Sequence, residues 1–262
     1  MVIKIDSLSN EKIKIANKIS QSSKARRENS MFFLEGKRLC YDAALTGIEV
    51  QWFFFTKTAF EKNQSEAEFI ISKANSSFEV SDAVAAKLSN TQNSQEFFCV
   101  CKALEEKGKD EIKADGKYIA LENVQDPANL GAICRTAEAL GIDGAICENC
   151  CDIYNPKAQR AAMGSLLRLP IILTDDLQSL LVSCKDKGMK LYSTTPDETK
   201  EKITCVPMDG GVIAVIGNEG NGVTERVSSI CRQITIPMLG RAESLNASMA
   251  AAITMWEIMR GM

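Results

Sequence analysis

The chain has 262 residues, of which 45% are hydrophobic, enough for one large domain or two modest ones. A net charge of −3 excludes a uniformly basic protein, and the absence of histidine excludes Ser-His-Asp hydrolases, Cys-His proteases and histidine metal sites. No apolar run approaches the ~20 residues of a membrane span, and the N-terminus lacks a signal peptide's apolar segment. Ten cysteines therefore indicate reduced thiols in a cytoplasmic protein.

Residues 1–104 are predicted to form a small α/β domain. We expect a helix rich in Lys and Arg over residues 10–28 and short apolar strands at 52–56 and 96–101. Residues 1–40 contain nine basic and four acidic side chains, a net charge of +5, whereas the remaining residues sum to −8. This asymmetry has two interpretations, an end that touches phosphates or the solvated face of a helix.

The charged segment 105–116, with a glycine near each end, is the best candidate for a linker. From residue 117 onward, strands and helices alternate, which predicts a parallel sheet covered by helices on both faces. Strands are expected at 117–122, 144–147, 169–173, 190–194, 212–217 and 233–237, and helices at 129–140, 155–167, 176–187, 223–231 and 245–259. Open sheets of this kind bind ligands at the carboxyl ends of their strands.

The first segment with chemical character covers residues 122–141. A polar turn precedes a helix that begins near Asn129, so backbone N–H groups are available there to a ligand. Gly131 and Arg135 are four residues apart and share a helix face, where Arg135 stands among small and apolar residues. The guanidinium of Arg135 is a candidate site group, and a surface salt bridge is the alternative.

The second segment, VIAVIGNEGNGV at 212–223, is an apolar strand that opens into a turn with glycines at 217, 220 and 222. Glycines there allow backbone groups to approach a ligand closely, but the spacing matches neither a phosphate loop nor the dinucleotide fingerprint. Glu219 would repel a phosphate, and it suits a cationic ligand or an arginine partner. We expect Glu219 to orient Arg135.

The third segment covers residues 234–258. A strand ends at Pro237, and a glycine-containing loop leads through Ser244, Leu245 and Asn246 into an alanine-rich helix that can pack closely on a neighbour. Serine and asparagine are also good helix N-caps, which is the structural alternative to a functional role.

Three cysteines, Cys147, Cys150 and Cys151, follow a strand in a C-x-x-C-C cluster. A zinc site would need a second pair nearby, and Cys99 and Cys101 form only a C-x-C pair in the other domain. We therefore interpret these cysteines as reduced structural thiols and expect no metal site.

The three segments, in this order, resemble the three motifs of the SpoU (TrmH) RNA 2′-O-ribose methyltransferases. The matching residues are Asn129, Gly131 and Arg135, then Gly217, Glu219, Gly220 and Gly222, then Ile236, Pro237, Met238, Ser244, Leu245 and Asn246. Residues 155–171 resemble the stretch between the first two motifs, and the likeness covers about residues 117–260. The segment KARRENSMFFLEGKRL (24–39) is more loosely similar to the ribosomal-protein-like substrate-binding domain of many members.

The resemblance implies a parallel-sheet α/β domain with a trefoil knot at 117–262, preceded by a small α/β RNA-binding domain at 1–104. It implies S-adenosylmethionine as the cofactor, held largely by backbone groups near Thr194, Gly217, Ile236, Met238 and Leu245. It implies a reaction centre lined by Asn129, Arg135, Glu219, Ser244 and Asn246. It also implies a homodimer with the site at the subunit interface.

The reaction so implied transfers a methyl group to a ribose 2′-hydroxyl of structured RNA, with ribosomal RNA preferred over transfer RNA. The family's proposed proton acceptor corresponds to Arg135. Because an arginine normally stays protonated below pH ~12, either its site disfavours the cation or it stabilises the developing oxyanion while another group takes the proton. The alternative functions are a non-catalytic RNA-binding or ribosome-assembly protein, and a nucleotide-binding enzyme that uses residues 217–222.

Overall fold

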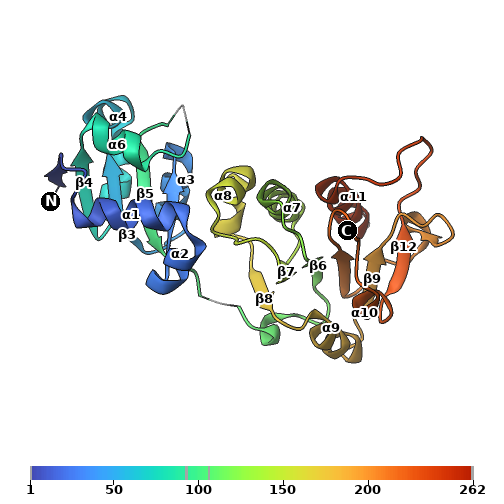
Figure 1. Ribbon diagram of the computed structural model, residues 1–262. Helices are drawn as coiled ribbons and strands as arrows, with labels where there is room; N and C mark the ends of the chain where they lie inside the picture. The colour runs from blue at the N-terminus through green and yellow to red at the C-terminus, as the bar shows by residue number, and fades with distance from the viewer. Residues whose placement is uncertain (1, 92–93, 106, 261–262) are drawn as a thin grey trace. The chain divides into compact units, whose positions relative to one another are not determined.

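The computed structural model describes residues 2–91, 94–105 and 107–260. The chain forms two compact units, each with its own sheet (Figure 1). The first unit comprises Met1–Glu105 and Tyr154–Leu167, and the second comprises Glu106–Ile153 and Arg168–Met262. Among the described residues, no helix has the length and apolar character that crossing a membrane requires.

The first unit contains a mixed five-stranded sheet in the order β1-β4-β3-β5-β2. Parallel pairs join β1 to β4 and β4 to β3, whereas β5 runs antiparallel to both β3 and β2. The strands are β1 (Val2–Ile5), β2 (Met31–Glu35), β3 (Val50–Phe55), β4 (Ser76–Val80) and β5 (Phe97–Lys102).

Aromatic side chains fill both faces of this first sheet. One face packs Phe33, Phe54, Phe78 and Phe98 against α1 (Glu11–Gln21) and α6 (Asp82–Leu88). The other face packs four more phenylalanines against α3 (Lys37–Leu45), α4 (Lys57–Lys62) and α5 (Gln64–Lys73). The two hydrophobic clusters of this unit therefore lie on opposite faces of one sheet.

The single helix predicted over residues 10–28 is two helices, α1 and α2 (Ser23–Asn29). The break lies at Ser22, which has an extended backbone and accepts a hydrogen bond from the N–H of Ala25 through its side chain. The serine hydroxyl caps the second helix, so a new helix begins where the apolar pattern alone predicted continuation.

Residues 154–167 belong to the first unit although their sequence neighbours belong to the second. Tyr154 stacks on Phe32 with 4.6 Å between ring centroids, and Leu167 is buried in the same aromatic core. The predicted helix 155–167 is shorter, because α8 (Pro156–Ala162) ends before Met163, whose φ of 51° is left-handed. A short 3-10 turn, η2 (Ser165–Leu167), follows.

The second unit contains a seven-stranded sheet in the order β10-β12-β9-β11-β6-β7-β8, and every strand pair is parallel. The predicted parallel α/β fold is therefore confirmed. The strands are β6 (Lys117–Glu122), β7 (Gly144–Glu148), β8 (Ile171–Thr174), β9 (Lys190–Thr194), β10 (Glu201–Lys202), β11 (Val212–Ile216) and β12 (Arg232–Thr235).

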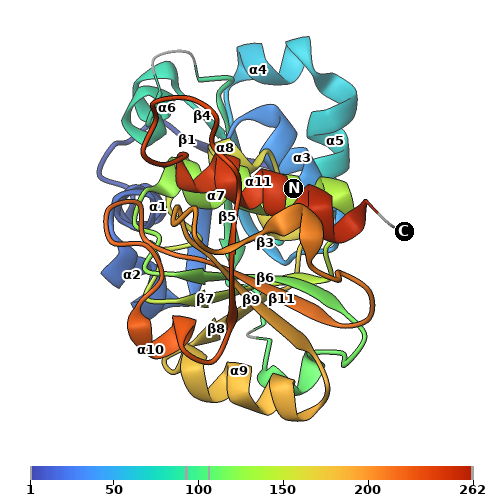
Figure 2. The same ribbon diagram turned by 90° about the vertical axis from the view of Figure 1, so that its right-hand side faces the viewer.

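Helices cover both faces of this second sheet. Figure 2 shows α7 (Pro127–Leu140) and α11 (Ala247–Met259) on one face, and α9 (Leu177–Asp186) and α10 (Glu225–Ser228) on the other. The helix predicted at 223–231 is thus only one turn long. The segment expected to be a linker contains the 3-10 turn η1 (Lys109–Glu111), and its residue Ile112 is buried in the second unit's core. Another 3-10 turn, η3 (Ile203–Cys205), follows β10.

Candidate active site

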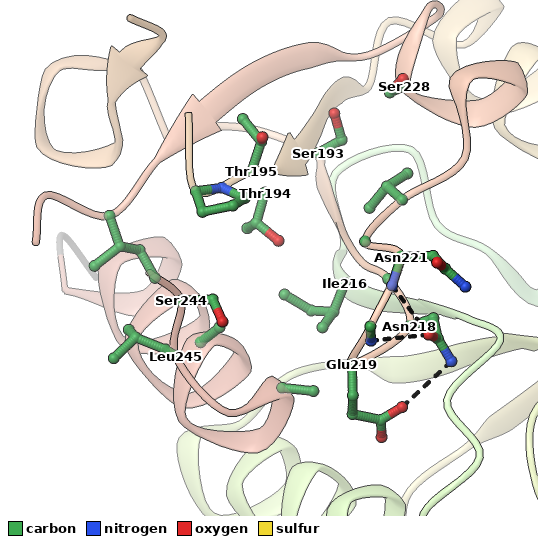
Figure 3. A pocket seen from close by; sticks show the side chains of 18 of the residues that line it. Ser193, Thr194, Thr195, Ile216, Asn218, Glu219, Asn221, Ser228, Ser244 and Leu245 are labelled. Atoms are coloured by element: carbon green, nitrogen blue, oxygen red, sulfur yellow. Dashed lines mark hydrogen bonds between the residues drawn. The ribbon is translucent and has the colours of Figure 1, made fainter. Parts of the chain in front are cut away.

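A cavity of about 420 Å³ lies at the carboxyl ends of β9, β11 and β12 in the second unit (Figure 3). Its walls come from the glycine-rich loop that follows β11, from the segment after β12, and from the start of α11. All five residues expected to hold the cofactor line it: Thr194, Gly217, Ile236, Met238 and Leu245. The parallel sheet therefore gathers residues from three distant segments at the edge where such sheets bind ligands.

Two residues of the expected reaction centre, Glu219 and Ser244, also line this cavity, whereas Asn129, Arg135 and Asn246 do not. Several other lining residues were not among those predicted from the sequence: Ser193, Thr195, Asn218, Asn221, Ser228 and Gln233. Ser193 and Thr195 flank Thr194 at the end of β9, so their signal was their place at a strand's carboxyl end.

The glycine-rich loop is a tight backbone structure. Asn218 and Gly222 exchange two backbone hydrogen bonds of 2.9 and 3.1 Å, and the side-chain oxygen of Asn218 accepts from the N–H groups of Gly220 and Asn221. A Cβ atom on Gly217 would overlap the backbone of Gly222, whose own φ of +69° favours glycine. Glycines 217 and 222 are therefore required by the close approach of the loop's two ends.

Hydrogen bonds join the polar residues of the three motifs. The amide nitrogen of Asn129 donates to Oε1 of Glu219 at 2.9 Å, and the amide nitrogen of Asn246 donates to Oδ1 of Asn129 at 3.1 Å. The Oδ1 of Asn246 accepts from the backbone N–H and hydroxyl of Ser248 and so caps α11. Asn246 therefore has the structural role of a helix cap and also contacts Asn129, while its site role stays a prediction. We name Asn129, Glu219 and Asn246 the motif cluster.

The expected pairing of Glu219 with Arg135 is wrong for the described chain. The carboxylate of Glu219 accepts from Asn129, while Arg135 is exposed on α7 and makes no ion pair within the described residues. Six residues of helix turn through about 600°, so Asn129 and Arg135 leave α7 on different faces. The helix also begins two residues earlier than expected, with Asp126 as its N-cap and Asn129 inside its first turn.

The cysteine cluster lies beside the ends of β6 and β7. The Cys150 thiol lies 3.4 Å from the carbonyl oxygens of Leu121 and Glu148, and a hydrogen bond from Cys147 lowers the pKa of Cys150. Burial raises the pKa of Cys134 to about 12. All ten cysteines are free thiols, and among the described residues no group of three or more cysteine or acidic side chains could hold a metal ion.

The charge of the cavity restricts its ligand. Among the described residues that line it, two are carboxylates, Glu219 and Glu243, and none is lysine or arginine. The hydroxyl of Ser193 is buried and has no hydrogen-bond partner in the described part of the chain, so its hydrogen-bonding capacity is unused there. The cavity therefore favours a polar ligand with positive charge over one with phosphate groups.

Comparisons with known proteins agree with this geometry. The SpoU rRNA Methylase family model matches residues 116–256, and the MRM3-like substrate binding domain matches residues 10–99. The 23S rRNA (guanosine(2553)-2'-O)-methyltransferase RlmP of Bacillus subtilis is 28% identical over 97% of this chain and 98% of its own length.

Solved structures match over both units. An AdoMet-bound rRNA methyltransferase from Sinorhizobium meliloti is 25% identical, with a TM-score of 0.89 over 100% of this chain and 98% of its own. The SpoU methyltransferase AviRb from Streptomyces viridochromogenes, at 21% identity, shares the fold, with a TM-score of 0.86 over 96% of this chain and 98% of its own. The family model covers more than half of the sequence, residues of the second and third motifs line one cavity, and the chain therefore belongs to the SpoU rRNA methylase family.

Proposed function

We propose that this protein transfers a methyl group from S-adenosylmethionine to a ribose 2′-hydroxyl of ribosomal RNA. The observation that carries the proposal is the motif cluster, in which hydrogen bonds join Asn129, Glu219 and Asn246 beside one cavity. The printed activity of the Bacillus subtilis relative, on 23S ribosomal RNA, supports ribosomal over transfer RNA.

The cavity fits S-adenosylmethionine in size and charge. Its volume of about 420 Å³ falls within the roughly 300–1,000 Å³ of small-molecule pockets. When bound, S-adenosylmethionine supplies an electrophilic methyl group on a positively charged sulfur, which suits a lining with two carboxylates. The residues assigned to hold it are Thr194, Gly217, Ile236, Met238 and Leu245.

The reaction centre in this proposal consists of the motif cluster with Ser244 and Arg135. Asn129 and Asn246 hold one another and Glu219 in place, so the amide and carboxylate groups are fixed before the ribose arrives. Arg135 has no carboxylate partner among the described residues and leaves α7 on a different face from Asn129. In this proposal its positive charge reaches the 2′-oxygen at the reaction centre of a second copy in the homodimer, as that atom loses its proton. Arg135 is thus assigned as the stabiliser of the developing oxyanion.

RNA binding is assigned to the first unit. The proposed organisation is an RNA-binding domain at 1–104, a linker at 105–116 and a methyltransferase domain at 117–262, whose knot stays a prediction. The match of residues 10–99 to a substrate binding domain supports this assignment. Residues 154–167 pack in the first unit's core, so RNA-binding studies should keep them together with residues 1–104.

A homodimer that acts in the cytoplasm is also part of this proposal. The helix α11 exposes Met249, Ile253 and Trp256, which are spaced to share one face, and Trp256 is 58% exposed. A second copy would cover this apolar stripe.

Light scattering should give about twice the 28.7 kDa chain mass. Trp256→Glu should shift the protein toward the monomer, whereas Leu45→Glu, at an exposed leucine of the first unit, should not. A wild-type monomer at micromolar concentration would contradict the dimer.

Two measurements test the methyltransferase function. Isothermal titration should detect S-adenosylmethionine binding but not ATP or NAD binding, since the described cavity lining has no cation for phosphates. Mapping of 2′-O-methyl groups in ribosomal RNA from cells with and without the gene should identify one site that disappears. A protein that binds RNA but neither binds S-adenosylmethionine nor changes this map would instead be the non-catalytic alternative.

A further inference from the structure

Two buried glutamates lie side by side at the carboxyl ends of β6 and β7. Glu122 is fully buried and Glu148 nearly so, and the strand register places them directly opposite one another. Two neighbouring carboxylates in such a site are unfavourable unless donors and cations surround them. Neither side chain lines the cavity, and neither was singled out as a functional residue in the sequence.

The donors for these carboxylates come mainly from α10 and the residue before it. Glu122 accepts from the backbone N–H of Thr224 at 2.8 Å and from its hydroxyl at 2.6 Å. Glu148 accepts from Nη2 of Arg226 at 2.6 Å. The same guanidinium lies 3.7 Å from Glu122 and 3.3 Å from Asp176, so one cation serves three carboxylates. The hydrogen bond to Glu148 raises the pKa of Arg226.

This arrangement ties both ends of the glycine-rich loop to β6. At the first end, the amide nitrogen of Asn218 donates to the backbone carbonyl of Asn123 at 3.0 Å. At the second end, Thr224 binds Glu122, the residue immediately before Asn123. The same short helix that contains Arg226 also contributes Ser228 to the cavity wall. The position of α10 therefore affects both the loop and the wall.

We infer that Glu122, Thr224 and Arg226 are positioning residues that set the glycine-rich loop and thereby the affinity for S-adenosylmethionine. The inference rests on the proposed function. Arg226 places one positive charge beside the two glutamates, and Glu122 accepts two hydrogen bonds from Thr224. Without the guanidinium, repulsion between the carboxylates of Glu122 and Glu148 favours their separation. The hydrogen bonds between Glu122 and Thr224 should then weaken.

Four variants of the full chain test this inference by isothermal titration with S-adenosylmethionine. Arg226→Gln removes the cation, and Thr224→Val removes only the hydroxyl donor to Glu122. We expect each to raise the Kd for S-adenosylmethionine by about tenfold. Thr224→Ser keeps the hydroxyl and should bind as wild type does. Arg232→Gln is the matched control, because Arg232 pairs with the exposed Glu201 and does not line the cavity, so this variant should leave the Kd unchanged.

Methyl transfer at varied cofactor concentration gives a second measurement. Arg226→Gln and Thr224→Val should raise the KM for S-adenosylmethionine more than they lower kcat. A general loss of stability does not produce this pattern. Melting temperatures on the same proteins identify any variant that fails to fold, and Thr224→Val keeps the test available if Arg226→Gln does so.

The outcomes separate this inference from the function on which it rests. A wild-type protein that does not bind S-adenosylmethionine overturns the proposed function. Wild-type binding combined with unchanged Kd values in both Arg226→Gln and Thr224→Val overturns only the positioning role. An equal loss of affinity in Arg232→Gln or Thr224→Ser also overturns it.

Discussion

The two units build their sheets from different residues and leave different surfaces for function. The first sheet is filled on both faces by aromatic side chains, and most charged side chains of the first unit lie on its helices. The second sheet is parallel, and its strand ends contribute hydroxyl, carboxylate and glycine residues to one edge. In the second unit, the sheet topology brings a few side chains and glycines to one cavity, so one substitution there should have a large effect on activity or cofactor affinity. In the first unit, the proposed RNA contacts rest on positive charge distributed over a surface, where one substitution should have a small effect.

Arg135→Ala should have the largest effect and would test the first half of this comparison. We expect single-turnover methyl transfer to fall by ~10²–10⁴-fold, the usual range when a residue that handles a proton or its charge is lost. Arg135→Lys should not restore the rate, because an ammonium does not reproduce the planar guanidinium. Cofactor affinity should change little, because Arg135 does not line the cavity.

Arg135 is exposed, so its loss should change the free energy of unfolding by less than ~0.5 kcal/mol. The matched control is Arg168→Ala, which removes a guanidinium that pairs with Glu138 of the same helix. A folded Arg135→Ala protein that methylates RNA at the wild-type rate would refute the catalytic assignment and weaken the contrast between the units.

Gly217→Ala should have the second largest effect, on cofactor affinity. The added Cβ overlaps the backbone of Gly222, which cannot move without opening the loop. We expect the Kd for S-adenosylmethionine to rise at least about tenfold and the free energy of unfolding to fall by about 1–3 kcal/mol. The measurements are isothermal titration and thermal melting.

Gly240→Ala is the matched control for that substitution, because a Cβ there meets no atom within 4 Å and Gly240 does not line the cavity. Its Kd and melting temperature should match those of the wild type. Equal tolerance of alanine at Gly217 and Gly240 would show that the loop does not depend on this close approach.

The strand pattern of the second unit was predictable because its elements differ sharply in sequence. A short run such as VIAVI, rich in β-branched residues and flanked by glycine, favours a buried strand over a helix. The carboxyl ends of such strands indicate the position of the cavity. The sequence therefore predicted that one edge of the sheet gathers Thr194, Gly217 and Met238. Their assignment to a cofactor came from the family resemblance.

Contacts between segments far apart in the sequence were not predictable from local pattern. The apolar residues Tyr154 and Leu167 show that their segment must pack on something, but nothing local indicates the aromatic core around Phe32. The predicted partner of Glu219 was wrong for a similar reason. Its charge suggested a pair with Arg135, but the fold places the side-chain amide of Asn129 beside its carboxylate. A carboxylate hydrogen bond depends on which group the fold brings within about 3 Å.

Neutralising exposed cations of the first unit should have the smallest effect and tests the second half of the comparison. Of the basic residues at the N-terminal end, Arg26 is buried and donates to backbone carbonyls, and Lys4 pairs with Glu79. Arg27 and Arg38 are exposed and make no ion pair within the described residues, so they are the better candidates for phosphate contacts. The double variant Arg27→Gln/Arg38→Gln should weaken RNA binding by several-fold and lower the slope of log K against log salt by about 1.5.

The charge-matched control for this double variant is Lys14→Gln/Lys57→Gln. Both lysines are exposed but pair with glutamates one helical turn away, Lys14 with Glu11 and Lys57 with Glu61. Removing a lysine whose charge is already compensated by a neighbouring carboxylate should change RNA affinity less than removing an unpaired arginine does.

Filter binding or fluorescence anisotropy at several salt concentrations measures the RNA affinity and its salt dependence. Cofactor affinity should stay at the wild-type value in every variant. If the two double variants lose the same affinity, RNA senses only the summed charge of the first unit. If neither loses any, the positive charge at this end does not bind RNA, and both large and small effects would belong to the second unit.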